Sequence, residues 1–309
     1  MKNSWKLLLG TLTFCLLLLS GIYLRLYLEH RIDTVETAET FGLDESEEKF
    51  SIHFFDVGEG DSALVECHGK RMLIDGGSPA YSSFLYSYLK QHGITYLDVV
   101  VNTHGHEDHV GGLAGALNYA KVGIVYGTEE ALDNRAFESF SKYVRQQGNL
   151  IQIPHPGDSF MLGDAEITFL GPVDHNLAKE NENNASLVLR IVYGQTSFLF
   201  TGDAEKEEEE SILEKGGILP CTVLKVAHHG SYTSSSEEFL KTANPKICII
   251  SVGGDNLHNH PHDSVLRRIR KIGSEIYRTD LCGEIVCISN GKDVYIQTEK
   301  PISGQEKGE

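Results

Sequence analysis

The chain has 309 residues, of which 40% are hydrophobic and 8 are proline, so it is a globular chain with enough material for a large core or two small ones. Its 27 basic and 44 acidic side chains give a formal net charge of −17. A domain this acidic repels a phosphate backbone at long range. Any nucleic-acid partner would therefore need a local basic patch or a metal ion.

The N-terminus carries a long apolar segment. Residues 7–24 read LLLGTLTFCLLLLSGIYL, an uncharged run of about the length that crosses a bilayer. The run is longer than the apolar part of a usual signal peptide, and no A-x-A-like cleavage site follows it. We therefore expect residues 1–28 to be an uncleaved single-pass anchor in the cell membrane, with a cleaved signal as the alternative. The slight excess of positive charge before the span favours an extracellular domain.

Three further segments follow the anchor. Residues 29–50 are acidic with little apolar periodicity, which predicts a solvated linker. Residues 51–299 are expected to form the folded domain, and residues 300–309 a polar tail. The six cysteines form no C-x-x-C pair, so disulfides are not expected to hold the fold, although a bond between Cys282 and Cys287 stays open.

Short strands alternate with helices from residue 51 onward, and no internal repeat is visible, which predicts a layered α/β fold with mixed sheets. The expected strands are 51–55, 62–67, 71–75, 97–103, 122–126, 166–171, 222–227 and 246–253, with a hairpin over 186–203 about Gly194 and another near Asn290 and Gly291. The expected helices are 83–93, 109–120, 131–148, 204–216, 236–243 and 264–273.

Two charge runs fall on these helices. The acidic run 205–210, EKEEEE, is expected to be a solvated helix face. The basic run 267–271, RRIRK, is expected to be the same; if it is not, it is the candidate basic patch for a polyanion.

The sequence THGHEDHVGG, residues 103–112, directly follows an apolar strand. Residues two apart in an extended loop point the same way, so His104 and His106 can offer imidazoles to one metal ion. Asp108 and His109 fall at the start of the next helix and can hold a second ion, while Gly111 and Gly112 let that helix approach closely. Imidazole with carboxylate suits Zn²⁺ and, less selectively, Mn²⁺ or Fe²⁺.

Eight of the 14 histidines fall in three tight groups that each follow an apolar strand. Scattered surface or core histidines would show no such grouping. Ligand-type residues at strand ends build metal sites, so we expect the groups to converge. The groups are His104, His106 and His109; His228 and His229; and His258, His260 and His262.

The segments FFDVGEGDSALVE, LIDGG, THGHEDHVGG, NNASLVL, FLFTGD, VLKVAHHGS and HNHPH occur in an order that resembles the metallo-β-lactamase superfamily. They look most like the hydrolase domain of ComEC-type DNA-uptake competence proteins, over residues 51–298. The long multi-helix membrane channel of those proteins is absent. The resemblance implies an αββα four-layer sandwich with two divalent metal ions, Zn²⁺ or Mn²⁺, at one edge.

The resemblance also implies roles for single residues. His104 and His106 would hold one ion, Asp108 and His109 the other, and Asp203 would bridge both. One histidine of the pair at 228 and 229 would complete the second ion, and we favour His229. The residues expected to act in catalysis are His228, His260 and Asp108.

His228 would contact substrate, and His260 would contact a substrate oxygen or a metal ion. Asp75 would orient the ligand loop. Asp56 and Asp61 would shape the rim, although an aspartate beside glycine commonly only caps a turn, and this reading applies equally to Asp75.

One position departs from the superfamily pattern. Hydrolytic β-lactamases place a third histidine on the first metal, whereas this sequence has Asn183 and Asn184 there, with His175 farther upstream. ComEC-type domains resemble this chain in that respect. The first ion would then be weakly held, filled only with substrate or by Mn²⁺, which argues against a β-lactamase.

The sequence therefore predicts a membrane-anchored hydrolase that cleaves a phosphodiester with water activated by two metals. Its partners would be a phosphodiester, with DNA implied by the resemblance alone, and the membrane through residues 7–24; no obligate protein partner is evident. Three alternatives stay open: a hydrolase of phosphorylcholine-type esters or lactones, a non-catalytic binding module, and a structural adaptor of a DNA-uptake system.

Overall fold

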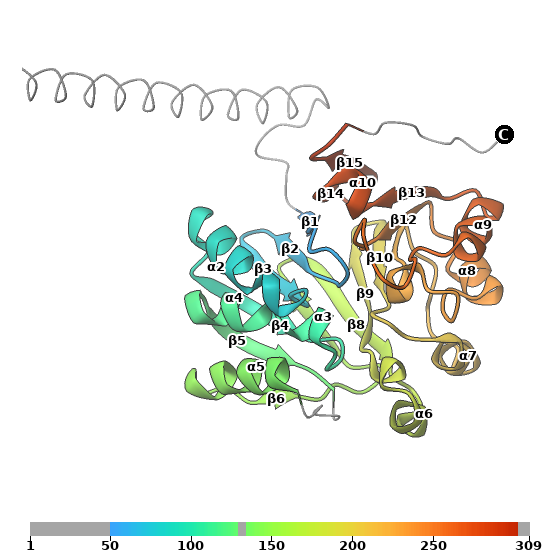
Figure 1. Cartoon of the computed structure of the whole chain (residues 1–309). Helices are drawn as coiled ribbons and strands as arrows, with labels where there is room; N and C mark the ends of the chain where they lie inside the picture. The colour runs from blue at the N-terminus through green and yellow to red at the C-terminus, as the bar shows by residue number, and fades with distance from the viewer. Residues whose placement is uncertain (1–49, 129–133, 302–309) are drawn as a thin grey trace, which may run out of the picture. The chain divides into compact units, whose positions relative to one another are not determined.

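The computed structural model describes residues 50–128 and 134–301, and these residues form two β-sheets (Figure 1). The strands of the first sheet lie in the order β15-β14-β1-β2-β3-β4-β5-β6. Their bounds are β1 (Phe50–Phe54), β2 (Ala63–Cys67), β3 (Lys70–Ile74), β4 (Tyr96–Val101), β5 (Lys121–Tyr126), β6 (Ile151–Gln152), β14 (Ile285–Ser289) and β15 (Val294–Thr298). The sheet is antiparallel from β15 to β3 and parallel from β3 to β6.

The second sheet has the order β13-β12-β11-β10-β9-β8-β7. Its strands are β7 (Ser159–Leu162), β8 (Ala165–Gly171), β9 (Val188–Tyr193), β10 (Thr196–Phe200), β11 (Val223–Lys225), β12 (Ile247–Ile250) and β13 (Glu275–Arg278). The predicted hairpin about Gly194 is confirmed, because β9 and β10 pair antiparallel with Tyr193 opposite Thr196. Strands β10 to β13 run parallel, so their carboxyl ends meet at one edge of the sheet.

Helices cover the outer face of each sheet, with α2, α4 and α5 on one side and α7, α8 and α9 on the other (Figure 1). The helical segments are η1 (Pro79–Tyr81), α2 (Ser82–Gln91), α3 (Glu107–Val110), α4 (Leu113–Tyr119), α5 (Arg135–Gln146), α6 (His175–Glu180), η2 (Glu182–Ala185), α7 (Lys206–Glu214), η3 (Ala227–Gly230), α8 (Glu237–Ala243), α9 (Asp263–Lys271) and α10 (Thr279–Cys282). The side chains of Asn134 and Ser236 cap the first turns of α5 and α8.

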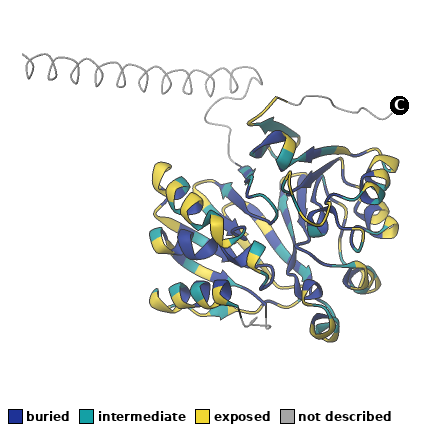
Figure 2. Cartoon of the chain, in the orientation of Figure 1, coloured by how far each residue is buried: buried dark blue, intermediate teal, exposed yellow. Residues whose placement is uncertain are grey.

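The core has three separate apolar clusters. One lies between the two sheets and includes Phe54 facing Phe200, whose ring centroids are 5.5 Å apart. The second joins the first sheet to α2, α4 and α5, and the third joins the second sheet to α7, α8 and α9. Figure 2 shows the strands mostly buried and the outer faces of the helices exposed. The predicted αββα sandwich is therefore confirmed.

The acidic run on α7 corrects one prediction. Glu208 and Glu209 are almost fully buried, at 0% and 1% exposure, whereas Lys206, Glu207 and Glu210 are exposed, so only part of this run is a solvated face. Glu208 accepts hydrogen bonds from the backbone N–H groups of Val173 and Asp174, and Glu209 accepts from those of the loop before α8. A charge run in sequence does not reveal which loops will supply buried donors.

The basic run on α9 has local partners. Arg268 donates to the carbonyl of Ser234, 2.8 Å away, and the ammonium group of Lys271 is 2.6 Å from Glu237. The cysteines at 67, 221, 248, 282 and 287 are buried and free, so Cys282 and Cys287 do not form a disulfide.

No helix within residues 50–128 and 134–301 is long and apolar enough to cross a membrane. The predicted anchor over residues 7–24 lies outside the described residues, as do nearly all of the predicted linker and tail.

Candidate metal centre

Four strand ends bring the ligand-type residues together at one edge of the sandwich. The loop after β4 carries the residues of THGHEDHVGG, and the loop after β10 carries Asp203. The short helix η3 after β11 carries His228 and His229, and the loop after β12 carries His260. Because β4 belongs to the first sheet and the other three strands to the second, both sheets contribute to the site.

The first group of side chains, which we call the four-residue cluster, consists of Asp108, His109, Asp203 and His229. His109 Nε2 is 3.2 Å from Asp203 Oδ1 and 3.8 Å from Asp108 Oδ2. His229 Nε2 is 3.3 Å from Asp108 Oδ2 and 3.6 Å from Asp203 Oδ2. Ligand atoms about 2.0 to 2.2 Å from a tetrahedral zinc ion lie roughly 3.3 to 3.6 Å from one another. The four-residue cluster therefore has the spacing of a metal cage.

Buried atoms without partners give an independent test of that fit. His109 Nε2, His229 Nε2 and Asp203 Oδ1 are buried and have no hydrogen-bond partner among the described residues. Leaving such a polar group buried and unsatisfied costs about 1 to 3 kcal/mol, and more for a charged group. Three such atoms that converge on one point are explained by a cation bound between them.

The second group, which we call the three-residue cluster, consists of His104, His106 and Asp203. His104 Nε2 lies 2.9 Å from His106 Nδ1 and 3.9 Å from Asp203 Oδ2. Asp203 belongs to both clusters, and a carboxylate has two oxygens with which to contact two ions. His106 is only partly buried, so this cluster is the more open one.

Each clustered histidine uses its other ring nitrogen to bond a support group. His109 Nδ1 donates to Asp75 Oδ2 at 2.9 Å, and His229 Nδ1 to the carbonyl of Ser251 at 3.0 Å. His106 Nε2 donates to Glu182 Oε2 at 3.0 Å. Metal-binding histidines characteristically carry such a partner, which fixes the tautomer and the ring orientation.

Thr103 supports His104 in the same way. The Thr103 hydroxyl donates to Asp75 Oδ2 at 2.6 Å, so its oxygen accepts from His104 Nδ1, 3.2 Å away. Ser186 lies 3.4 Å from the same nitrogen, and its hydroxyl oxygen accepts from the backbone N–H of Asp203. These contacts tie the two ligand loops together.

The carboxylates and imidazoles of the clusters perturb one another strongly. Burial alone would lower the pKa of His229, but Asp203, Asp108 and Asp61 raise it to about 10. Burial likewise opposes the charged form of His109, whose pKa the neighbouring carboxylates, Asp203 first, raise well above its ordinary value. The pKa of His104 is lowered well below its ordinary value, first by burial and then by the charge of His109. Negative charge at this edge attracts cations.

Lys225 is a buried residue of the site that the sequence analysis missed. Its ammonium group lies 2.7 Å from Asp61 Oδ1 and donates to the carbonyl of Val226. Asp61 Oδ1 is also 3.4 Å from His229 Nδ1. All three residues of its strand, Val223–Lys225, are buried. The signal in the sequence that could have identified Lys225 is a lysine inside the apolar run TVLKVA.

Asp61, Asp75 and His109 form a third group of ligand-type side chains. The atoms that face one another in this group have partners in the protein, because Asp61 Oδ1 pairs with Lys225 and Asp75 accepts from Thr103 and from His109 Nδ1. We therefore assign no ion to this group. Asp56 lies apart from all three groups, where it accepts from the N–H of Gly58 and is 3.7 Å from Lys300.

Asn183 and Asn184 contact Glu205. Asn183 Nδ2 donates to Glu205 Oε1 at 3.0 Å, and Asn184 Oδ1 accepts from the backbone N–H of Glu205 at 2.8 Å. Asn183 Oδ1 is buried and has no hydrogen-bond partner among the residues that the structure describes. Neither asparagine belongs to a cluster.

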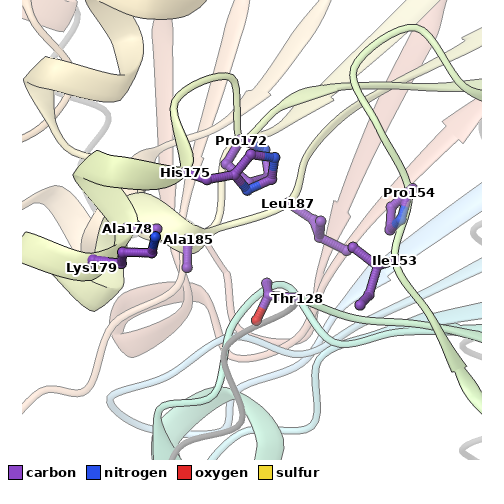
Figure 3. Close-up of a pocket in the computed structure, with 9 residues that line it drawn as sticks. All are labelled: Thr128, Ile153, Pro154, Pro172, His175, Ala178, Lys179, Ala185 and Leu187. Carbon is purple, nitrogen blue, oxygen red and sulfur yellow. The ribbon is translucent and has the colours of Figure 1, made fainter.

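His175 lies away from the ligand clusters as well. It lines a separate pocket of about 60 Å³ together with Pro172, Leu187 and Thr128 (Figure 3). The wall of this pocket continues through Ala185 into the turn that carries the two asparagines. His175 therefore does not replace the third histidine of the first metal.

His228 and His260 flank the clusters without belonging to them. His228 and His229 both have positive φ, at 50° and 52°, a conformation that is uncommon for residues other than glycine and that clusters at functional sites. His228 Nε2 is 3.8 Å from Asp203 Oδ2. The ring of His260 lies 5.6 Å from that of His228 and 6.2 Å from that of His229. The three histidine groups therefore do meet at one edge.

Residues 55–254 match the family model described as the Metallo-beta-lactamase superfamily. Curated relatives include ComE operon protein 3 of Bacillus subtilis (strain 168), which is 33% identical over 76% of this chain and 32% of its own length. Competence protein ComA of Neisseria gonorrhoeae is 31% identical over 77% of this chain and 32% of its own length. The chain thus spans about a third of the length of these relatives, and the predicted relation to ComEC-type competence proteins is confirmed.

Solved structures show the same fold at low sequence identity. YhfI from Bacillus subtilis, a metallo-beta-lactamase fold protein, has a TM-score of 0.50 and 15% identity, with 80% of this chain and 100% of that chain covered. CmlA, a diiron β-hydroxylase from Streptomyces venezuelae, has a TM-score of 0.52 and 16% identity, with 82% and 59% covered. Family match, relatives and fold agree, and the chain belongs to the metallo-β-lactamase superfamily.

Proposed function

We propose that this protein is a membrane-anchored metal-dependent phosphodiesterase, with DNA as a candidate substrate. The observation that carries the proposal is the pair of ligand clusters that share Asp203. Two divalent cations held about 3.5 to 4 Å apart lower the pKa of a water molecule towards neutrality and neutralise charge that develops on a phosphate. The imidazole and carboxylate ligands suit Zn²⁺ or Mn²⁺.

The residues around the clusters then have separate tasks. His104, His106, Asp108, His109, Asp203 and His229 would hold the cations, with Asp75 and the Ser251 carbonyl orienting two of the rings. His228 and His260 flank the same edge and would supply a hydrogen bond or a proton to a substrate oxygen. Asp108, at 33% side-chain exposure, is the ligand carboxylate most open to substrate.

A phosphodiester suits this site better than a β-lactam. The three-residue cluster contains two histidines, and Asn183 and Asn184 contact Glu205 and do not belong to it. A cation held only by the three-residue cluster would be weakly bound. An anionic phosphate would supply further oxygen ligands to it. The acidic chain has no need of a broad basic surface if cations in the cage bind the phosphate.

DNA as substrate, the anchor and an extracellular domain rest on the sequence and the competence relatives. The apolar run 7–24 supports an anchor. Protease treatment of intact cells tests the topology: loss of the folded domain from intact cells supports an extracellular position, and its protection until lysis contradicts it.

A substrate panel tests the activity. The purified full-length protein, loaded with Zn²⁺ or Mn²⁺, is assayed against bis(p-nitrophenyl) phosphate, single-stranded DNA, a phosphorylcholine ester, a lactone and nitrocefin. We expect turnover of the two phosphodiesters and its loss in Asp203→Ala. Turnover of nitrocefin, the lactone or the choline ester with inert phosphodiesters would overturn the proposal. A metal-poor protein without any turnover would instead support a binding or adaptor role.

A further inference from the structure

Glu59 and His260 form a hydrogen-bonded pair at the edge of the metal centre. His260 Nδ1 lies 2.7 Å from Glu59 Oε1, and the two side chains are only 6% and 22% exposed. The other oxygen of Glu59 accepts from the backbone N–H of Gly253 at 3.3 Å. Neither residue belongs to a ligand cluster.

A tight turn holds Glu59 in place, and the side chain of Asn256 holds His260. Gly58 and Gly60, on either side of Glu59, have φ of 65° and 135°, which allow the tight turn that carries it. The backbone N–H of Asp61 then donates to the carbonyl of Asp108, which ties this turn to the ligand loop. Asn256 holds His260 from the other side, accepting from its N–H at 2.7 Å and donating to its carbonyl at 2.8 Å.

The charge state of Glu59 determines which nitrogen of the His260 ring carries a hydrogen. Burial opposes the charge of Glu59, but the hydrogen bond from His260 and the charge of His229 lower the Glu59 pKa below its ordinary value. An ionised carboxylate can only accept, so His260 Nδ1 carries a hydrogen. Nε2, on the other side of the ring, has no hydrogen-bond partner within residues 50–128 and 134–301.

His228 has a weaker version of the same arrangement. Its Nδ1 lies 3.4 Å from Glu205 Oε1. The carboxylate of Glu205 already accepts hydrogen bonds from Asn181 and Asn183. The shorter contact and the less shared carboxylate favour His260 as the histidine that is held for proton transfer.

We propose that Glu59 is a positioning residue that holds His260 with Nε2 directed to the leaving oxygen of a phosphodiester; this rests on the proposed function. A water oxygen forms a bond to phosphorus while the bond from phosphorus to the leaving oxygen breaks. The His260 ring enters this step with hydrogen on both nitrogens. The leaving oxygen keeps the electron pair of the broken bond and takes the Nε2 proton, the attacking water releases a proton to solvent, and a proton from solvent later restores Nε2. The Nδ1 hydrogen stays on His260 throughout, donated to Glu59 Oε1.

Leaving-group dependence tests the proposal. Glu59→Gln and His260→Gln are compared with Glu284→Gln, a matched control because Glu284 Oε1 is also 2.7 Å from a histidine Nδ1, that of His53, outside the ligand clusters. The substrates are a thymidine dinucleotide, whose alkoxide needs a proton, and bis(p-nitrophenyl) phosphate, whose phenolate does not. For Glu59→Gln we expect kcat on the dinucleotide to fall by about 10-fold or more, and that on the nitrophenyl ester by less than about 3-fold.

The same variants should keep the wild-type KM and metal content, and Glu59→Gln should cause no further loss in a His260→Gln background. Glu284→Gln should match wild type on both substrates. Equal losses on the two substrates, or additive losses in the double variant, would overturn the proposal by showing that Glu59 acts through structure alone.

Nitrogen-15 spectra of histidine-labelled, zinc-loaded protein give a readout that needs no activity. The His260 resonances, assigned by their loss in His260→Gln, should show hydrogen on Nδ1 in the wild type and should shift in Glu59→Gln but not in Glu284→Gln. Unchanged His260 shifts in Glu59→Gln would contradict the positioning role. A wild-type protein that cleaves no phosphodiester would defeat the proposed function, while these spectra would still decide whether Glu59 holds His260.

Discussion

His228 and His229 are adjacent in sequence and share the same unusual backbone conformation, yet their side chains have different surroundings. His229 is 2% exposed, and its Nε2 is one of the buried atoms without a partner. His228 has a side chain 21% exposed, and its ring contacts that of His260. The tight turn sends one ring into the cage and leaves the other on its rim.

This difference predicts different effects of substituting the two histidines. His229→Ala removes one of four ligands from the more complete cluster, so we expect the purified protein to lose about one bound metal ion per chain. His228→Ala should keep the wild-type metal content and lose activity. Elemental analysis by mass spectrometry distinguishes the two, and a comparable loss of metal from His228→Ala would reverse the assignment.

The motif H-x-H-x-D-H, in six consecutive positions, contains four of the six side chains that the structure brings together in the two clusters. Of the supporting side chains the sequence indicated Asp75, which bonds His109 and Thr103, but not the more distant ones. Glu182 supports His106 from 76 residues away, and Glu59 supports His260 from 201 residues away. No local spacing connects such residues, because only the folded chain places them together.

Helix α7 shows the same limit at the level of an element. Its position was predicted from the run of helix-forming residues, but its buried face was not. Glu209 accepts backbone hydrogen bonds from Ser235 and Ser236 at the start of α8, and Glu208 accepts from the loop before α6. The helix therefore holds two loops in place through hydrogen bonds, in addition to covering the second sheet.

We expect Glu209→Ala to destabilise the fold by about 2 to 4 kcal/mol, because two buried N–H groups lose their acceptor. Glu210→Ala is the matched control on the same helix. Glu210 is exposed and, within the described part of the chain, forms an ion pair only with Lys206, so its loss should cost less than about 0.5 kcal/mol. Urea unfolding of the purified proteins measures both values, and similar values for the two variants would contradict the role of Glu209.

Glu208 should make the stability of the protein depend on pH. Burial raises its pKa from 4.5 to about 7, so between these values the folded state binds a proton more tightly than the unfolded state. Stability is then full below pH 4.5 and falls as the pH rises through 7, by at most about 3 kcal/mol. Glu208→Gln keeps a carbonyl acceptor and should remove this fall. Parallel pH profiles of unfolding free energy for wild type and Glu208→Gln would contradict the prediction.

At the scale of the molecule, the metal centre joins the two sheets. His104, His106, Asp108 and His109 follow a strand of the first sheet, whereas Asp203 and His229 follow strands of the second. The layered fold and the edge at which the site lies could be predicted, since hydrophobic runs alternate with helices and ligand residues follow the strands. The order of the strands could not, because it depends on pairings between distant segments.

A cation bound by residues that follow strands of both sheets should stabilise the whole fold. Ligands that bind only the folded state add stability by mass action, about 2.7 kcal/mol at a hundredfold excess over Kd. We expect chelation to lower the Tm of the wild-type protein by several degrees and to leave the Tm of Asp203→Ala unchanged. The same Tm for wild type with and without chelator would show that no cation links the sheets.

Titration of the metal-free protein with Mn²⁺ tests most directly whether two cations that share Asp203 act together. Bound metal and hydrolysis of bis(p-nitrophenyl) phosphate are measured on the same samples. We predict that activity stays low while one ion fills the four-residue cluster and rises as another ion binds in the three-residue cluster, with His106→Ala binding one ion and remaining inactive. Full activity with one ion per chain, or in His106→Ala, would contradict the two-metal account.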